Sequence, residues 1–202
     1  PDSAYQQLLV TPYSHRLEGI THKVEEYTDT KGIASAASIA STVRDLANYV
    51  SLQFREDDNT PEAVLKGSSL QEMQRVQFLR PSWSSGWGLG WAVWQRNGKT
   101  VNGHGGWVGG NRTQIMFIPE EKVGVIVLTN ADDGEPSFLA RHILDYMGPL
   151  ILAEYAQTTE SLSEFDISWK KYTGTYVEPG PYYTEVLIRD KHFVMSTLSY
   201  PP

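Results

Sequence analysis

The 202 residues are enough for one full domain, or for one domain and part of another. Seventeen basic residues against 24 acidic ones give a net charge of −7, which argues against nucleic acid or an anionic membrane as the main partner. The absence of cysteine excludes disulfides and a cysteine nucleophile, and no apolar run reaches the ~20 residues that span a bilayer.

The first regular element that the sequence predicts is a helix beginning after Thr42. Thr42 and Asp45 form a capping-box pattern, in which each side chain can satisfy the backbone N–H of the other residue. Apolar residues then recur at helical spacing and describe a buried stripe: Leu46, Tyr49, Val50 and Phe54. A second, short helix is predicted from Ser69, where Ser69 and Glu72 repeat the capping pattern, to about Phe78.

Strand-like patterns follow. The glycine-punctuated run 86–94 is predicted as a strand, and Asn97-Gly98 is a strong hairpin-turn signal. The next strand should run from Thr100 into residues 103–106. The runs 113–118 and 123–129 are rich in β-forming residues, and the second is apolar on both faces, as in a central strand covered by helices.

A further helix is predicted from Ser137 to Met147. Gly148 suits the position just past the end of that helix, and Pro149 suits the start of another helical turn running towards Tyr155.

These elements predict an α+β fold, an antiparallel β-sheet flanked by helices. We expect residues 1–156 to form this domain and residues 157–165 to form a polar linker. Residues 166–202 then contain strand patterns of a separate β unit, which is too short to close a core alone.

The segment from Gly103 to Asn111 is the most informative stretch for function. It holds five glycines in nine residues, although each glycine inside a strand lowers stability by roughly 0.5–1 kcal/mol relative to alanine. Glycine is expected in a strand where a ligand or another backbone comes close, so a substrate amide could pair here beside His104. The alternative is a bulged, twisted strand that ends in a hairpin histidine.

An ordered set of motifs resembles the serine β-lactamase and penicillin-binding-protein superfamily over about residues 12–155. His104-Gly105-Gly106 matches the His-x-Gly form of the motif that this superfamily carries on an edge strand. The flanking matches are the helix start at Ser41-Thr42, the segment Gly88 to Trp91, and the strand ending Leu128-Thr129-Asn130. The fold is therefore expected to be β-lactamase/transpeptidase-like, but incomplete.

Two other motifs of that superfamily are missing where they belong, upstream of Pro12. They are Ser-x-x-Lys, which gives the nucleophile and its base, and Tyr-x-Asn, which assists proton transfer. Ser168 to Lys171 matches Ser-x-x-Lys in letters only, because it follows the sheet, and we interpret it as a solvated linker. We therefore expect this chain to be catalytically incomplete and to need a partner, an N-terminal segment or chain that carries the nucleophile.

The resemblance implies acyl transfer on a small-molecule or peptide substrate. The five histidines show no close pairing of the metal-binding type, so neither a metal nor another cofactor is expected. In that mechanism the Trp107 backbone N–H supplies an oxyanion donor, and His104 lies beside the reacting group as a hydrogen-bond donor or electrostatic aid. Gly105 and Gly106 allow close backbone approach. Three further residues are expected to line the substrate pocket: Tyr13, Asn111 and Arg112.

Histidine in place of the superfamily's lysine has a chemical consequence. Lysine is cationic and suits a substrate carboxylate, whereas histidine is mostly neutral at pH 7. This favours the esterase, D-aminopeptidase or peptidase-like branches over a dedicated β-lactamase. The tail, residues 172–176 and 185–196, resembles the opening strands of the lipocalin-like β-barrel that some members append.

Two alternatives to a hydrolase fragment remain. One is a binding or regulatory module that keeps the fold without chemistry, and the other is a plain α+β structural domain, which leaves the glycine-rich strand unexplained. If part of the domain is missing, an apolar face of the sheet should lie uncovered.

Overall fold

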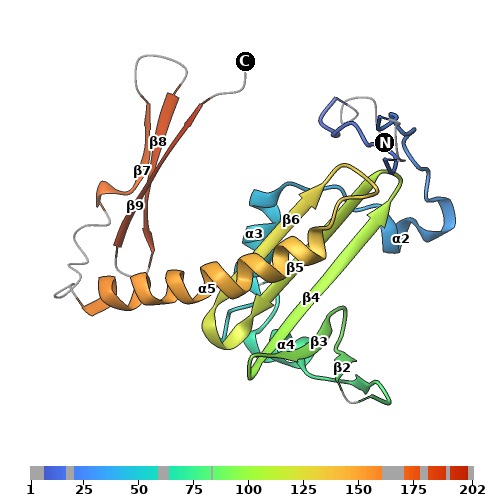
Figure 1. Ribbon diagram of the computed structural model, residues 1–202. Helices are drawn as coiled ribbons and strands as arrows, with labels where there is room; N and C mark the ends of the chain where they lie inside the picture. The colour runs from blue at the N-terminus through green and yellow to red at the C-terminus, as the bar shows by residue number, and fades with distance from the viewer. Residues whose placement is uncertain are drawn as a thin grey trace. The chain divides into compact units, whose positions relative to one another are not determined.

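The computed structural model describes residues 7–16, 21–58, 64–82, 84–160, 171–177, 182–189 and 192–199 (Figure 1). The chain divides into two compact units, residues 1–152 and 153–202. The first unit contains a six-stranded antiparallel sheet in which each strand pairs with the next in sequence. This confirms the predicted α+β fold class.

The bounds of the strands and helices in this unit are as follows. The strands are β1 (Phe78–Leu79), β2 (Ser85–Trp87), β3 (Ala92–Arg96), β4 (Lys99–Val108), β5 (Asn111–Ile118) and β6 (Val123–Thr129). The helices are η1 (Lys31–Ile33), α2 (Ala34–Ala37), α3 (Val43–Leu52), α4 (Gly67–Gln74), η2 (Pro119–Glu121) and α5 (Pro136–Glu160), which continues into the second unit.

Helices cover the sheet on both faces, with α5 across one face and α3 on the other (Figure 1). Strand residues alternate between the faces, so neighbours in sequence enter different cores. The core under α5 consists of Val101, Met116, Ile118, Val123, Ala140 and Leu144. The core on the α3 side consists of Val50, Trp91 and Phe117, with Phe54, Met73, Ile115 and Ile126 packed around it.

The helix predicted after Thr42 is confirmed as α3. The Thr42 hydroxyl accepts a hydrogen bond from the Asp45 backbone N–H at 3.2 Å, as expected of an N-cap. The Asp45 carboxylate, however, accepts from the Thr42 hydroxyl at 2.9 Å, so the predicted reciprocal bond to a backbone N–H is replaced by a bond between side chains.

The predicted start of the second helix at Ser69 is wrong. Helix α4 begins at Gly67, and Asp58, ten residues before Ser68, accepts from both the Ser68 N–H and its hydroxyl at 2.9 Å. These two hydrogen bonds hold the pKa of Asp58 below its ordinary value. The helix ends at Gln74, because Phe78 pairs with Trp87 in the sheet.

The run 86–94 is two strands instead of the single one predicted. The chain leaves the sheet after Trp87 and returns at Ala92. Between them the Leu89 N–H donates to the Met73 carbonyl at 2.9 Å, so this segment bonds to the end of α4. A Cβ at Gly88 would lie 2.2 Å from the same carbonyl oxygen, which explains one of the glycines.

Strand β6 is apolar on both faces, as predicted, because Val125 and Val127 pack under α5 while Ile126 packs on the α3 side. Among the described residues β6 is the last strand of the sheet. Within the described residues, each face of the sheet carries a buried cluster. Among the exposed apolar side chains of the described residues, several lie on α5: Phe138, Leu139, Ile143, Tyr146, Met147, Leu150 and Ile151.

Helix α5 passes through Pro149 without ending, which corrects the predicted break at Gly148. Gly148 is buried and faces Val123, and Leu152 packs against the core under α5. The helix includes residues 157–160 of the expected linker, and residues 161–170, with the Ser168 motif, lie outside the described residues.

The second unit contains a three-stranded antiparallel sheet of β7 (Gly174–Val177), β8 (Tyr182–Arg189) and β9 (His192–Ser199). In the part of the chain that the structure describes, no helix is long and apolar enough to cross a membrane. The domain bounds expected from the sequence stay predictions.

Candidate active site

Two tight hairpins fix the register of β4, the strand that carries His104. The turn 97–98 joins β3 to β4, as predicted, and the turn 109–110 joins β4 to β5. All four turn residues have positive φ, which matches the two-residue turns that suit a twisted hairpin.

This register decides which backbone groups of β4 stay unpaired. The residues beside a two-residue turn form a hydrogen-bonded pair, and such pairs alternate along the ladder. Counting from either turn places the N–H and C=O of Gly105 and Trp107 on the side of β3. Because β3 begins at Ala92, opposite Gly103, no strand of the described residues pairs with Gly105 or Trp107 there. We call these two residues the open edge of β4.

His104 is exposed beside the open edge. It shares the α3 side of the sheet with its cross-strand partner Ile115. Its ring Nδ1 lies 2.7 Å from the carbonyl oxygen of Gly105. Its ring also contacts the edge of the Trp87 ring, with centroids 5.8 Å apart and the planes at 62°. Trp87 was not predicted as a site residue, because its contact with His104 joins strands that are not neighbours in the sheet.

The Trp107 side chain is 68% exposed, and is held by an acidic residue that the sequence did not single out. Asp132 Oδ1 accepts from Trp107 Nε1 at 2.7 Å and from the Gly110 backbone N–H at 2.9 Å. Asp132 thereby ties the loop after β6 to the β4–β5 turn, which holds the end of the open edge in place.

The glycines of β4 pack so closely against β5 that a side chain at these positions would meet other atoms of the protein. A Cβ at Gly106 would lie 2.8 Å from Thr113 Oγ1, and one at Gly105 would lie 3.1 Å from Gln114 Oε1. At Gly103 it would lie 2.4 Å from the backbone oxygen of Ile115. Close packing against β5 is therefore one reason for the glycine content of this strand, beside the substrate approach that was predicted.

The remaining predicted pocket residues lie at the end of the sheet near the 109–110 turn. The Asn111 amide donates to the Gly109 carbonyl at 3.0 Å. Arg112 donates to the Gly134 carbonyl at 2.8 Å, and its guanidinium lies 5.1 Å from the Trp107 ring centroid. Both side chains are thus engaged with the protein, and neither contacts His104.

Tyr13 is placed at the same end by its backbone. Its N–H donates to Asn130 O and its carbonyl accepts from Asp132 N–H, at 2.9 and 3.0 Å. Its ring lies 6.4 Å from the ring of His22 instead of beside His104. The predicted residues therefore lie at one end of the sheet, but the rings of Tyr13 and His104 have different neighbours. Tyr13 lies near His22, and His104 contacts Trp87.

An unpredicted ion pair lies beside Tyr13. His22 Nε2 is 3.2 Å from Asp133 Oδ2. The pKa of Asp133 is held below its ordinary value, chiefly by the Arg16 backbone N–H, which donates to Oδ2 at 3.1 Å, and also by the charge of His22. Separation in sequence, about 110 residues, hides this pair from motif analysis. Among the described residues no group of three or more His, Cys, Asp or Glu side chains could hold a metal ion.

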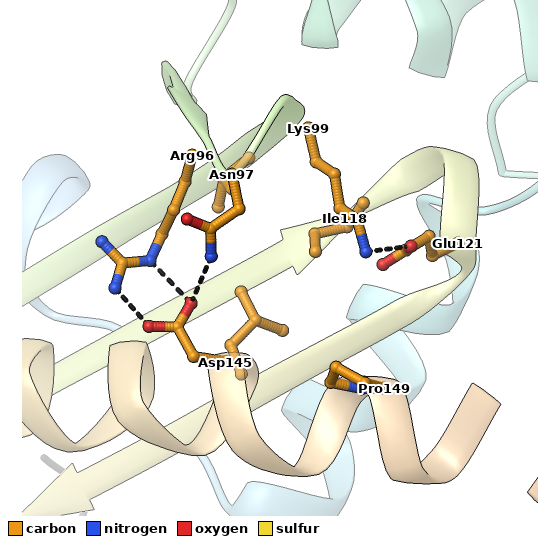
Figure 2. Close-up of a pocket in the computed structure, with 9 residues that line it drawn as sticks. Arg96, Asn97, Lys99, Ile118, Glu121, Asp145 and Pro149 are labelled. Carbon is orange, nitrogen blue, oxygen red and sulfur yellow. Dashed lines mark hydrogen bonds and ion pairs between the residues drawn. The ribbon is translucent and has the colours of Figure 1, made fainter. Parts of the chain in front are cut away.

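A cavity of about 50 Å³ lies at the other end of β4, near the 97–98 turn (Figure 2). It is lined by two ion pairs, Arg96 with Asp145 and Lys99 with Glu121, and its floor includes Ile118. A cavity of this size holds one or two waters, and its charges neutralise one another. It therefore has no role in the candidate site.

Comparison with known proteins identifies one family. The beta-lactamase family model matches residues 5–146. An octameric penicillin-binding protein homologue from Pyrococcus abyssi has a similar structure, with 22% identity over 94% of this chain and a TM-score of 0.53. The protein SurE is similar at 15% identity over 92% of this chain, also with a TM-score of 0.53. The chain spans 43% and 42% of the lengths of these two structures, and no curated protein matches it.

Proposed function

The chain belongs to the beta-lactamase family, and we propose that it supplies the His-Gly-Gly half of a serine hydrolase active site that works through an acyl-enzyme. The observation that carries this proposal is the open edge of β4. It presents the unpaired Trp107 N–H on the strand that carries His104, and the opposite side of that strand is bonded to β5.

The serine and its activating lysine come, in this proposal, from a segment or chain outside these 202 residues. The serine attacks the carbonyl carbon of an ester or amide, and the carbonyl oxygen becomes an oxyanion. The lysine takes the serine's proton, and the Trp107 N–H donates to the oxyanion as one of two donors. When the oxyanion collapses, the bond to the alcohol or amine breaks and that leaving group takes the proton, which leaves an acyl-serine. Water then attacks the acyl-serine, which releases the acid and restores the serine. Loss of one such donor typically lowers the rate 10²–10³-fold.

Substrates without a carboxylate fit this site better than penicillins do. His104 takes the position where the family's lysine would meet a carboxylate, and the guanidinium of Arg112 is bound to the Gly134 carbonyl. We therefore place the activity with esterases, D-aminopeptidases or other peptidases. An assembled enzyme that cleaved penicillins far faster than simple esters or D-amino-acid peptides would contradict this assignment.

A covalent probe tests where the nucleophile resides. A fluorophosphonate should label no serine in the 202-residue chain alone, and should label a serine of the added upstream fragment when the two are combined. Labelling and turnover by the chain alone would refute the proposed origin of the nucleophile. A complex that binds substrate analogues but is never labelled would support the alternative, a binding or regulatory module that keeps the fold.

A matched pair of variants tests the oxyanion donor in the assembled enzyme. Trp107→Ala removes the indole but keeps the backbone N–H, whereas Trp107→Pro removes the N–H at an unpaired edge position, where proline is tolerated in a strand. We expect the proline variant to lose roughly 10²–10³ more kcat than the alanine variant. Equal losses in the two variants would exclude the Trp107 N–H as a donor.

A further inference from the structure

The Gly105 carbonyl restricts His104 to one tautomer. A carbonyl oxygen can only accept, so the 2.7 Å contact requires a proton on His104 Nδ1. In the neutral imidazole only one ring nitrogen carries a proton, which leaves Nε2 with an exposed lone pair. The backbone of the motif itself therefore sets the hydrogen-bonding role of its histidine.

Trp87 restricts the same ring from another direction. Its indole meets the His104 ring edge-on, with centroids 5.8 Å apart, and remains 37% exposed. The histidine is held between this ring and the Gly105 carbonyl. The exposed part of the indole gives an apolar surface beside the His104 ring.

We propose that His104 is a fixed hydrogen-bond acceptor at Nε2, and that the substrate meets it with a hydroxyl, amide or amine N–H beside an apolar group seated on Trp87. The substrate half of this inference rests on the proposed function. An acceptor role at Nε2 is the reverse of the hydrogen-bond donor role that the sequence resemblance implied for His104. A carboxylate, which only accepts, would oppose the Nε2 lone pair.

Nitrogen NMR of the uniformly ¹⁵N-labelled 202-residue chain tests the tautomer without any need for activity. In alkaline buffer, where imidazole is neutral, His104 should show a protonated Nδ1 and an unprotonated Nε2. The His104→Gln variant identifies the signal by its loss. A protonated Nε2 would overturn the proposal, whatever the covalent probe shows about the nucleophile.

Two other histidines are internal controls. His142 Nδ1 lies 2.8 Å from the Phe138 carbonyl oxygen, so it should show the same tautomer as His104. His22 contacts Asp133 through Nε2, so that nitrogen should carry a proton. Trp87→Ala should leave both controls unchanged and shift the His104 tautomer ratio towards the Nε2–H form.

Phenylmethanol and phenylacetate, which share an aromatic ring, test the substrate half. Phenylmethanol should shift the His104 Nε2 resonance with at least threefold higher apparent affinity than phenylacetate, and Trp87→Ala should weaken that response. His104→Lys should reverse the order of the two affinities. In this variant binding is measured from the chemical shift of the Trp107 amide. Equal or reversed affinities in the parent chain would overturn the substrate half and leave the tautomer result standing.

Discussion

The ion pair between Arg96 and Asp145 should stabilise the first unit measurably. Arg96 donates from Nε to Asp145 Oδ1 at 2.7 Å and from Nη2 to Oδ2, which clamps the β3–β4 hairpin to α5 (Figure 2). The side chains are 32% and 25% exposed, so solvent screens part of the attraction. We expect Asp145→Asn to lower the free energy of unfolding by about 1–2 kcal/mol. This estimate lies between the value for a hydrogen bond to a charged group and the value for an exposed ion pair.

For a unit of this size, each kcal/mol lowers Tm by roughly 2–4 °C. The effect should depend on pH in one direction. The Arg96 hydrogen bond holds the pKa of Asp145 below its ordinary value, so the stabilisation is present above the unfolded-state pKa, about 3.9, and is lost as pH falls through the folded-state pKa. The difference between parent and variant should therefore shrink as pH falls below about 3.9, the unfolded-state pKa.

Thermal and urea unfolding, followed by circular dichroism and tryptophan fluorescence, measure this difference. Glu72→Gln is the matched control, since the Arg75–Glu72 pair at the end of α4 is far more exposed and should contribute nothing measurable. Equal losses in the two variants would refute the clamp. A loss at Asp145 that stayed constant down to acid pH would refute its electrostatic origin.

Three further predictions concern packing and hydrogen bonds. Gly106→Ala should destabilise the chain in urea unfolding, because the added Cβ would lie 2.8 Å from Thr113 Oγ1. A second change, Thr113→Ala, should restore much of the lost stability. If it restored none, the clash would have to lie with other atoms. Asp132→Ala should lower the free energy of unfolding by about 1–2 kcal/mol and alter Trp107 fluorescence, whereas Asp132→Asn, which keeps an acceptor, should change both less. Thr42→Ala should lower it by about 0.5–2 kcal/mol through loss of the N-cap, and Thr42→Ser, the control, should stay near the parent value.

Local patterns predicted the elements whose causes are local. The 97–98 turn and the cap at Thr42 depend on a few adjacent residues, and both are present. The errors arose where distant residues decide. Asp58 accepts a hydrogen bond from the Ser68 backbone N–H at the start of α4. Gly148 is buried against Val123 in a helix that continues past a proline. Such contacts leave no periodic signal in the sequence.

The candidate site divides in the same way. The motif located His104 and the strand, and the family match agrees with that resemblance. Its surroundings were not predictable, because Trp87 and Asp132 reach the strand from other elements. That the Trp107 N–H stays unpaired also depends on the observed start of β3 at Ala92, which the sequence did not predict.

The two turns that bound β4 constrain how this segment can change in length. Insertion of one residue between them would exchange the backbone groups that face β5 with those that face the open edge, and would move each following side chain to the other face of the sheet. An insertion of two residues preserves both alternations. Single-residue insertions and deletions between residues 99 and 108 should therefore be far less tolerated in a deletion-and-insertion scan than paired ones.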